Sequence, residues 1–386
     1  MKKIVVKNLA QISKAKIVLG DLTILTGPQA TGKSIFLQLL KLILDGDDIA
    51  KKIKKYGYDW NHNWSDFLEL YFGEGMSGIW KADTKVTVDG EKVDFEKDLY
   101  KTGNARKENL FLIPAQRVLT LKNGWPRNFG DYEITDPYVV KNFSEHMRLL
   151  MEAGIGKGDA PIFPQTGRMK QVLREKLNAT IFNGAEVKLD KTGFRKRIVL
   201  DVDAHKLPFM VWSAGQREFM PLLLGLYWLL PSSKTTKKEH IDIVVIEEAE
   251  MGLHPRAISS LVLIFLELLH RGYKVVLSTH SPVLLDVVWA IKTIQEHGAD
   301  PSLLLKLFEL KPTKDMQELC ADIVNNKEFN SYFFDKDETN KVKTVDISSL
   351  DPGDENSIVA EWGGLIEFSS KANDIVAEAV SSTERL

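Results

Sequence analysis

The chain has 386 residues, of which 44% are hydrophobic and 27% charged, and its formal net charge is -2. This length allows two compact domains or one large domain with insertions, and the composition excludes a wholly disordered or fibrous protein. The balanced charge provides no global field toward nucleic acid or anionic lipid, so such binding would need a local patch. A single cysteine, Cys320, and apolar windows too short to cross a bilayer predict a cytoplasmic protein.

Three short apolar segments open the chain, at residues 3–6, 15–19 and 21–25, with polar or glycine breaks between them. This pattern predicts short strands. Apolar residues at helical spacing then predict a helix over residues 31–44, which Asp45 and Gly46 are expected to end. The loop at residues 27–34 therefore joins a strand to a helix.

The middle of the chain, approximately residues 47–185, has the character of an insertion. Residues 81–95 resemble a hairpin, residues 109–113 a buried strand, and residues 137–151 and 168–182 two helices, so an inserted, mainly helical lobe is expected. The head would comprise residues 1–310. Residues 311–386 would form a C-terminal region that packs on the head or contacts partners.

Strand and helix patterns alternate after the insertion. A hairpin-like pair at residues 186–191 and 195–203 precedes a predicted helix at residues 216–230. Strands are predicted at residues 241–246 and 274–278, and a helix at residues 256–270 lies between them. The β-branched content of these strands is typical of parallel strands that are buried on both faces. This order indicates an α/β fold with a mixed or parallel sheet at its core.

Residues 27–34 match the phosphate-binding pattern G-x-x-x-x-G-K-[ST] at every fixed position. The strand before them and the helix after them are the context that the motif demands; the alternative is a glycine-containing turn with a surface lysine. In such a loop the backbone N–H groups converge on phosphates, Lys33 reaches the outer phosphates, and the Ser34 hydroxyl ligates Mg²⁺. The candidate nucleotide-binding residues are Gly27, Pro28, Gln29, Ala30, Thr31, Gly32, Lys33 and Ser34.

Two adjacent carboxylates, Glu247 and Glu248, follow the predicted strand at residues 241–246. The carboxyl ends of strands in a nucleotide-binding sheet face the ligand, so this acidic step is expected beside the phosphate loop. Glu247 would hold Mg²⁺, directly or through water, and Glu248 would orient or deprotonate the attacking water. The alternative is a solvated turn after a core strand.

A second possible anion site starts at Ser213, where a hydroxyl and backbone amides lie at a predicted helix start. Because the chain already has a phosphate loop, Ser213, Gly215 and Gln216 are expected to close over the γ-phosphate bound by a neighbouring subunit. Ser-Ala-Gly is also a common helix N-cap. His280 follows the strand at residues 274–278, where it could contact the same phosphate or serve structure alone.

Taken in chain order, these residues resemble the ABC-type ATPases of the structural-maintenance-of-chromosomes (SMC) and overcoming-lysogenization-defect-like group. Residues 27–34 look like the Walker A motif, residues 213–216 like the signature motif, and residues 250–255 like the D-loop. Gln116 resembles the Q-loop glutamine, which implies roles in catalysis and in Mg²⁺ binding. Glu247 and Glu248 resemble the Walker B end, and His280 resembles the catalytic switch histidine.

The resemblance implies that two heads sandwich ATP and Mg²⁺, so that Ser213 and Gly215 of one chain meet the Walker A loop of the other. Two residues depart from the family pattern. Ala214 replaces the first of the two usual signature glycines, and Glu247 stands where aspartate is commoner, which moves the carboxylate outward.

Within that family, the length and residues 211–219 and 362–364 look similar to ATPases of bacterial anti-phage systems such as PARIS. This implies a homodimer or higher homo-oligomer that controls a separate effector, commonly a nuclease encoded nearby, and responds to a phage trigger protein. No acidic set typical of a nuclease follows residue 310. A DNA-repair or DNA-tethering ATPase is the alternative, with basic clusters at residues 51–55, 195–197 and 234–238; no membrane partner is expected.

Overall fold

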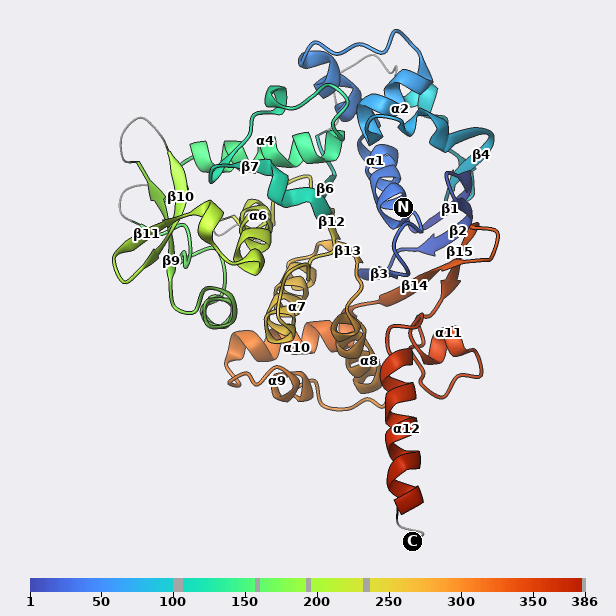
Figure 1. Ribbon diagram of the computed structural model, residues 1–386, viewed down its shortest axis with the longest axis vertical. Coiled ribbons are helices and arrows are strands. Elements are labelled where there is room, and N and C mark those ends of the chain that lie inside the picture. Colours follow the sequence, from blue (N-terminus) through green and yellow to red (C-terminus); the bar gives the residue numbers. More distant parts are fainter. Residues whose placement is uncertain (100–106, 157–159, 192–195, 232–236, 384–386) are drawn as a thin grey trace.

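The computed structural model describes residues 1–99, 107–156, 160–191, 196–231 and 237–383. These residues form a ten-stranded mixed sheet with helices on both faces (Figure 1). The strand order is β5-β4-β1-β2-β15-β14-β3-β13-β12-β6. Its strands are β1 (Lys3–Leu9), β2 (Ile12–Val18), β3 (Leu22–Thr26), β4 (Trp80–Val88), β5 (Glu91–Lys92), β6 (Leu110–Ile113), β12 (Ile243–Glu247), β13 (Lys274–Ser278), β14 (Phe329–Lys336) and β15 (Val342–Asp346).

One half of this sheet, formed by β14, β3, β13, β12 and β6, is parallel throughout. Successive side chains of a strand point to opposite faces, and both faces are covered here. In β12, Val245 belongs to the apolar core on one face and Val244 to the core on the other. Helix α1 (Lys33–Lys55) packs on the first face, and α6 (Ala214–Leu229), α7 (Pro255–His270) and α8 (Pro282–Glu296) pack on the second. The expected α/β fold is therefore confirmed.

The other half of the sheet is largely antiparallel and begins with the hairpin of β1 and β2. Strands β4 and β5 extend it, and they form the hairpin expected at residues 81–95. Asp89 and Gly90 connect them with φ of 51° and 96°. Two left-handed residues in succession are what a tight two-residue hairpin turn requires.

Strands β14 and β15 come from the expected C-terminal region, yet they lie inside the sheet between β3 and β2. Strand β14 pairs with β3 in parallel, so it runs beside the start of the phosphate loop. A Cβ atom on Gly27, whose φ is 140°, would lie 2.8 Å from the carbonyl oxygen of Phe334. Gly27 is thus required by the close approach of β14 as well as by the loop conformation.

Helix α1 does not end at Asp45 and Gly46, so that part of the sequence prediction is wrong. Asp45 leaves the helical conformation, with φ of -121° and ψ of 17°, and the helix then continues to Lys55. The carboxylate of Asp45 accepts hydrogen bonds from the N–H groups of Asn109 at 2.8 Å and Leu110 at 3.1 Å. These bonds to the start of β6 bend α1 instead of ending it.

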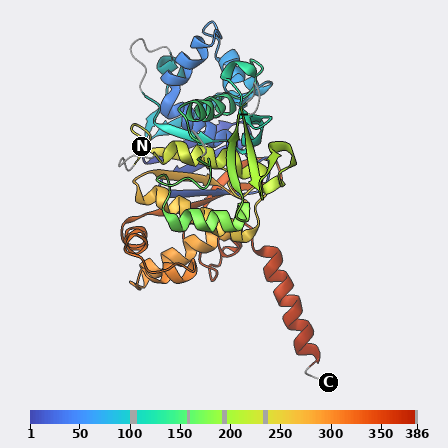
Figure 2. The same cartoon turned by 90° about the vertical axis from the view of Figure 1, so that its left-hand side faces the viewer.

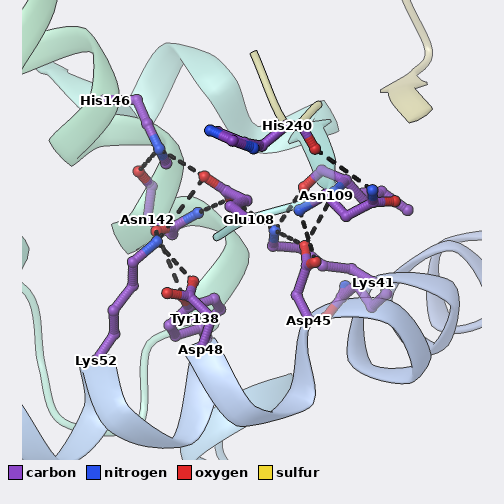
Figure 3. Close-up of polar contacts among 12 residues, drawn as sticks. Lys41, Asp45, Asp48, Lys52, Glu108, Asn109, Tyr138, Asn142, His146 and His240 are labelled. Carbon is purple, nitrogen blue, oxygen red and sulfur yellow. Dashed lines mark hydrogen bonds and ion pairs between the residues drawn. The ribbon is translucent and has the colours of Figure 1, made fainter. Parts of the chain in front are cut away.

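A buried polar network joins α1 to α4 (Tyr138–Glu152) through Glu108 (Figure 3). The Lys41 ammonium donates to Glu108 at 2.7 Å, to Asp45 at 3.1 Å and to the carbonyl of Leu110 at 2.7 Å. His146 of α4 lies 2.8 Å from the other oxygen of Glu108. The network therefore fixes the helix after the phosphate loop against β6 and α4.

Replacing Lys41 with methionine is expected to lower the free energy of unfolding by about 3–5 kcal/mol, because the buried carboxylate of Asp45 loses its cation and Glu108 loses its nearest one. Lys52 provides the control, since it lies on the same helix and contacts Glu108 only at 3.8 Å; it pairs with Asp48 at 2.8 Å, and its side chain is 30% exposed. Lys52→Met is expected to cost less than about 1 kcal/mol. Urea unfolding of both variants measures the difference; equal losses would contradict a special role for Lys41.

Two smaller sheets and several helices complete the described residues. Residues 168–182, expected as one helix, form α5 and a following π-helical turn, Asn178–Phe182. Helix α12 projects away from the body in both views (Figures 1 and 2). The remaining α-helices and strands are α2 (Trp64–Phe72), α3 (Phe95–Leu99), β7 (Leu121–Lys122), β8 (Trp125–Pro126), α5 (Gln171–Leu177), β9 (Glu186–Asp190), β10 (Arg197–Val202), β11 (His205–Pro208), α9 (Leu303–Leu307), α10 (Lys314–Asn326), α11 (Ser357–Ala360) and α12 (Glu367–Thr383). Short 3-10 helices lie at Met76–Ile79, Ala115–Thr120, Phe129–Asp131 and Phe209–Val211.

Two of the three basic clusters fall partly outside the described residues, at residues 192–195 and 232–236, whereas residues 51–55 form the last turns of α1. Within the described part of the chain, none of the helices combines the length and the apolar character that a membrane span needs. Cys320 is buried in α10 as a free thiol.

Candidate active site

Four neighbouring parallel strands, in the order β3-β13-β12-β6, end at one edge of the sheet. The phosphate loop follows β3, and residues 114–117 follow β6. Glu247 ends β12, and His280 lies two residues beyond β13. The sheet thus brings these separate segments of the sequence to one edge, as the motif positions predict.

The side chain of Lys33 is folded into its own loop. Its ammonium donates to the carbonyl oxygens of Gly27 at 2.7 Å and Pro28 at 2.8 Å. Burial lowers the pKa of Lys33 to about 8, while the charges of Glu248 and Glu250 oppose this shift. A phosphate at the loop would replace carbonyl oxygens with a charged acceptor, which binds an ammonium more strongly.

Glu247 is fully buried, and only one of its two carboxylate oxygens is satisfied. Oε2 accepts a hydrogen bond from the N–H of Ala115 at 3.0 Å, whereas Oε1 has no partner among the described residues. Burial raises the pKa of Glu247 to about 7; the charge of Glu248 acts in the same direction, and the Ala115 N–H and the Ser34 hydroxyl lower it. A buried carboxylate with a bare oxygen next to the Ser34 hydroxyl fits a bound Mg²⁺, which prefers oxygen ligands.

Glu248 lies in the left-handed region of backbone space, with φ of 44°. This conformation is costly for a residue with a side chain and persists only when the surroundings hold it. Its N–H donates to the carbonyl oxygen of Ser278 at 3.0 Å. Its carboxylate lies 3.8 Å from Nε2 of His280. The expected general base and the expected switch histidine are therefore adjacent.

Glu250 holds the backbone before His280. One oxygen of its carboxylate accepts from the Thr279 hydroxyl and from the His280 N–H, each at 2.7 Å. Burial lowers the pKa of His280 and the positive charge of Lys33 adds to the effect, while Glu248 and Glu250 oppose it. The imidazole is therefore biased toward its neutral form, which can accept a proton or a hydrogen bond.

Residues 114–117 place Gln116 one residue after Ala115, whose N–H binds Glu247. Gln116 is exposed at this edge. The next residue, Arg117, is fully buried and donates to backbone oxygens of Glu218, Glu247 and Glu248. Sequence reasoning missed Arg117; the only signal was its place directly after Gln116.

Ser213 and Gln216 cap the start of α6. The N–H of Gln216 donates to the Ser213 hydroxyl at 3.3 Å, and the N–H of Ser213 donates to the Gln216 side chain at 3.2 Å. This capping box is the structural alternative to anion binding. Ser213 and Ala214 are nevertheless exposed at a helix N-terminus.

Gly215 packs against the turn that follows the two carboxylates. A Cβ atom on Gly215 would lie 2.6 Å from the carbonyl oxygen of Gly252, which is closer than side-chain carbons approach in proteins. The start of α6 and residues 250–255 therefore share one backbone contact, and only glycine fits it.

Replacing Gly215 with alanine is expected to lower the free energy of unfolding by about 1–3 kcal/mol, because the new methyl group overlaps a backbone oxygen. Gly46, inside α1, is the matched control: a Cβ there would meet only side-chain carbons, of Leu99 at 3.6 Å and of Leu42 at 4.0 Å. Gly46→Ala is expected to stabilise the chain by up to about 1 kcal/mol, since alanine has the higher helix propensity. Thermal unfolding compares them, and an unchanged midpoint for Gly215→Ala would contradict the overlap.

Comparison with known families finds a match to part of the chain. Residues 154–286 match the AAA_21 family, whose description reads "AAA domain, putative AbiEii toxin, Type IV TA system". The matched segment contains Ser213, Glu247, Glu248 and His280, and it begins after the phosphate loop. No curated protein matches the chain.

Among solved structures, the chain is similar to SMC heads and ABC cassettes. The SMC head domain from Thermotoga maritima is 11% identical with a TM-score of 0.38, covering 89% of this chain and 98% of that one. The Smc head from Pyrococcus furiosus, bound to a domain of ScpA, is 10% identical with a TM-score of 0.42, covering 89% and 95%. A dimeric bacterial ABC transporter cassette is 11% identical with a TM-score of 0.31, covering 73% and 89%.

Proposed function

We propose that the chain binds ATP with Mg²⁺ at this edge of the sheet and hydrolyses the γ-phosphate. The observation that supports the proposal most is the convergence of the Lys33 loop, the half-satisfied carboxylate of Glu247, and the Glu248–His280 pair. Burial makes the charged form of Glu247 unfavourable without a cation, and its one unpartnered oxygen is available as a cation ligand. The match to an AAA family over residues 154–286 supports the same activity.

In this mechanism the chain positions water and phosphate and moves one proton. Lys33 and the loop N–H groups hold the phosphates, and Ser34, Glu247 and Gln116 hold Mg²⁺, which neutralises charge on the phosphate oxygens when bound. Glu248 accepts the proton of the attacking water as its oxygen bonds to the γ-phosphorus. The bond from that phosphorus to the bridging oxygen breaks, and ADP and phosphate leave. His280 hydrogen-bonds the phosphate from the side of Glu248.

We further propose that ATP is bound between two copies of the chain. Ser213, Gly215 and Gln216 of one copy would meet the phosphate loop of the other. The support is an exposed helix N-terminus that follows exposed apolar residues: Met210 is 64% exposed and Val211 is 62% exposed. An apolar patch beside an anion-binding helix end suits a contact that closes only around nucleotide.

The biological role that we propose is a nucleotide-gated sensor and scaffold in anti-phage defence, similar to AriA, the ATPase subunit of PARIS. The closed ATP-bound assembly would hold a separate effector, a nuclease toxin encoded nearby, and a phage protein would trigger its release. The match to an AAA domain over residues 154–286 supports only the ATPase part of this role.

The test uses the purified full chain and its genomic neighbour. We expect Mg²⁺-dependent ATP hydrolysis, a doubling of mass by light scattering with ATP, and copurification of the neighbouring protein. A chain that hydrolyses ATP but retains no neighbour would overturn the scaffold role alone. Hydrolysis stimulated by duplex DNA, with salt-dependent DNA binding, would favour the DNA-tethering alternative.

A further inference from the structure

Arg117 connects the two parts of the site that come from distant segments of the chain. Its Nη1 donates to the carbonyl oxygen of Glu247 at 2.9 Å, and its Nη2 donates to that of Glu248 at 3.0 Å. Its Nε donates to the carbonyl oxygen of Glu218, in the second turn of α6, at 3.1 Å. One planar side chain therefore holds the end of β12 and the start of α6 together.

This arrangement requires arginine. Three N–H groups on a rigid plane point to three carbonyl oxygens, and an ammonium group on a flexible stem cannot reproduce that fork. Burying a cation is costly, and Arg117 has no exposed surface. A buried apolar side chain would fill the same space without that cost. We therefore infer that arginine is needed here for its three N–H donors.

The backbone at Glu248 is the element that Arg117 restrains. The Glu248 N–H donates to the carbonyl oxygen of Ser278, and the Glu248 carbonyl accepts from Arg117 at 3.0 Å and from the Met251 N–H at 3.1 Å. Both ends of a residue with φ of 44° are thereby fixed. Without the Arg117 contact, only the Met251 N–H of the following turn holds the Glu248 carbonyl. We then expect this residue to relax toward negative φ, which swings its carboxylate away from His280.

The other end of the connection lies on the helix that carries Ser213. Glu218 is one turn beyond Gly215, and Gly215 touches Gly252 in the turn after Glu250. The start of α6 is thus in backbone contact with the turn after Glu248, and it is connected to Glu247 and Glu248 through the Arg117 side chain. Any displacement of this helix start reaches the Glu248 turn through rigid contacts instead of through a flexible loop.

We propose that Arg117 is a positioning residue that sets the backbone of Glu248 and ties its placement to the position of helix α6. The inference rests on the proposed ATP hydrolysis and deepens it. When Ser213 contacts nucleotide bound by a second copy, a shift of α6 moves the Arg117 side chain, and Arg117 in turn moves the backbone of Glu248. Arg117 itself touches neither phosphate nor water.

The test replaces Arg117 with lysine, which keeps the charge, and with glutamine, which keeps a planar donor. Both variants are expected to bind ATP with unchanged Kd and KM while kcat falls about 100-fold, the usual effect of misplacing a catalytic group by about 1 Å. Arg168 is the matched control, because it donates to the carbonyl oxygens of Tyr227 and Leu230 at the other end of α6. Arg168→Lys is expected to leave kcat unchanged.

A double-mutant cycle separates this role from a general loss of structure. Combining Arg117→Lys with Glu248→Gln should lower the rate no further than Glu248→Gln alone, because both changes remove the same function. Additive losses, an unchanged kcat in Arg117→Lys, or an equal loss in Arg168→Lys would overturn the role of Arg117 alone. A chain that hydrolyses no ATP before any substitution would overturn the proposed function and this role with it.

Discussion

Glu248→Gln is expected to slow ATP hydrolysis strongly, to a residual rate that can still be measured, while ATP binding is kept. Glutamine has the size of glutamate and fits the same left-handed backbone, but its amide cannot accept the proton of the attacking water. We expect kcat to fall by about 100- to 10,000-fold, the usual contribution of a general base. ATP affinity should stay within about a factor of a few, and the ATP-bound dimer should accumulate, because the step that opens it no longer occurs. Phosphate release and light scattering with ATP measure the two effects.

Two further substitutions make this prediction specific to Glu248. Glu309 is an exposed glutamate with φ of 51°, so Glu309→Gln makes the same chemical change at a comparable backbone position and should alter nothing. Glu247→Gln should instead raise the Mg²⁺ concentration needed for half-maximal activity, because it weakens the proposed metal ligand. If Glu248→Gln hydrolysed ATP at the unsubstituted rate, the assignment of the base would be wrong.

Lys33→Ala is expected to remove nucleotide binding. The lysine is the one side-chain cation of the phosphate loop. Losing its charge-assisted hydrogen bonds to phosphate should weaken the binding free energy by about 3 kcal/mol, which raises Kd about 100-fold. A fluorescent ATP analogue titrated at low micromolar protein measures the change. The variant should show neither hydrolysis nor ATP-dependent dimerisation.

Lys55→Ala is the control for Lys33→Ala, since Lys55 lies at the exposed end of the same helix. It should bind the analogue normally. The Lys33 ammonium also holds two carbonyl oxygens of its own loop, so thermal unfolding without nucleotide must accompany the titration. A folded Lys33→Ala chain that binds ATP with ordinary affinity would remove the phosphate loop from the mechanism.

Much of the site could be predicted because its residues directly follow strands that short runs of apolar residues reveal. The apolar segments of β3, β12 and β13 are short, β-branched and bounded by turn residues, so each strand end could be located without a structure. Parallel strands place their carboxyl ends at one edge. That rule alone predicted the meeting of Lys33, Glu247 and His280.

Other features depend on contacts between residues far apart in the chain. Asp45 and Gly46 are typical helix-ending residues, but Asp45 binds the N–H groups of residues 109 and 110, and α1 continues. The pairing of β14 with β3 joins segments about 300 residues apart. No local propensity encodes such a partner, since strand pairing is decided by packing against the whole core.

The amino-acid sequence by itself determined the chemical groups available to this protein: the phosphate loop, the two adjacent carboxylates and the strand-end histidine. Each can be recognised from a short run of residues and the strand next to it. Only the tertiary structure decided how those groups are held. Arg117 acts on carbonyl oxygens, and Gly215 meets the backbone of Gly252. Backbone acceptors are the same at every residue, so no sequence pattern can mark which of them a distant side chain will bind.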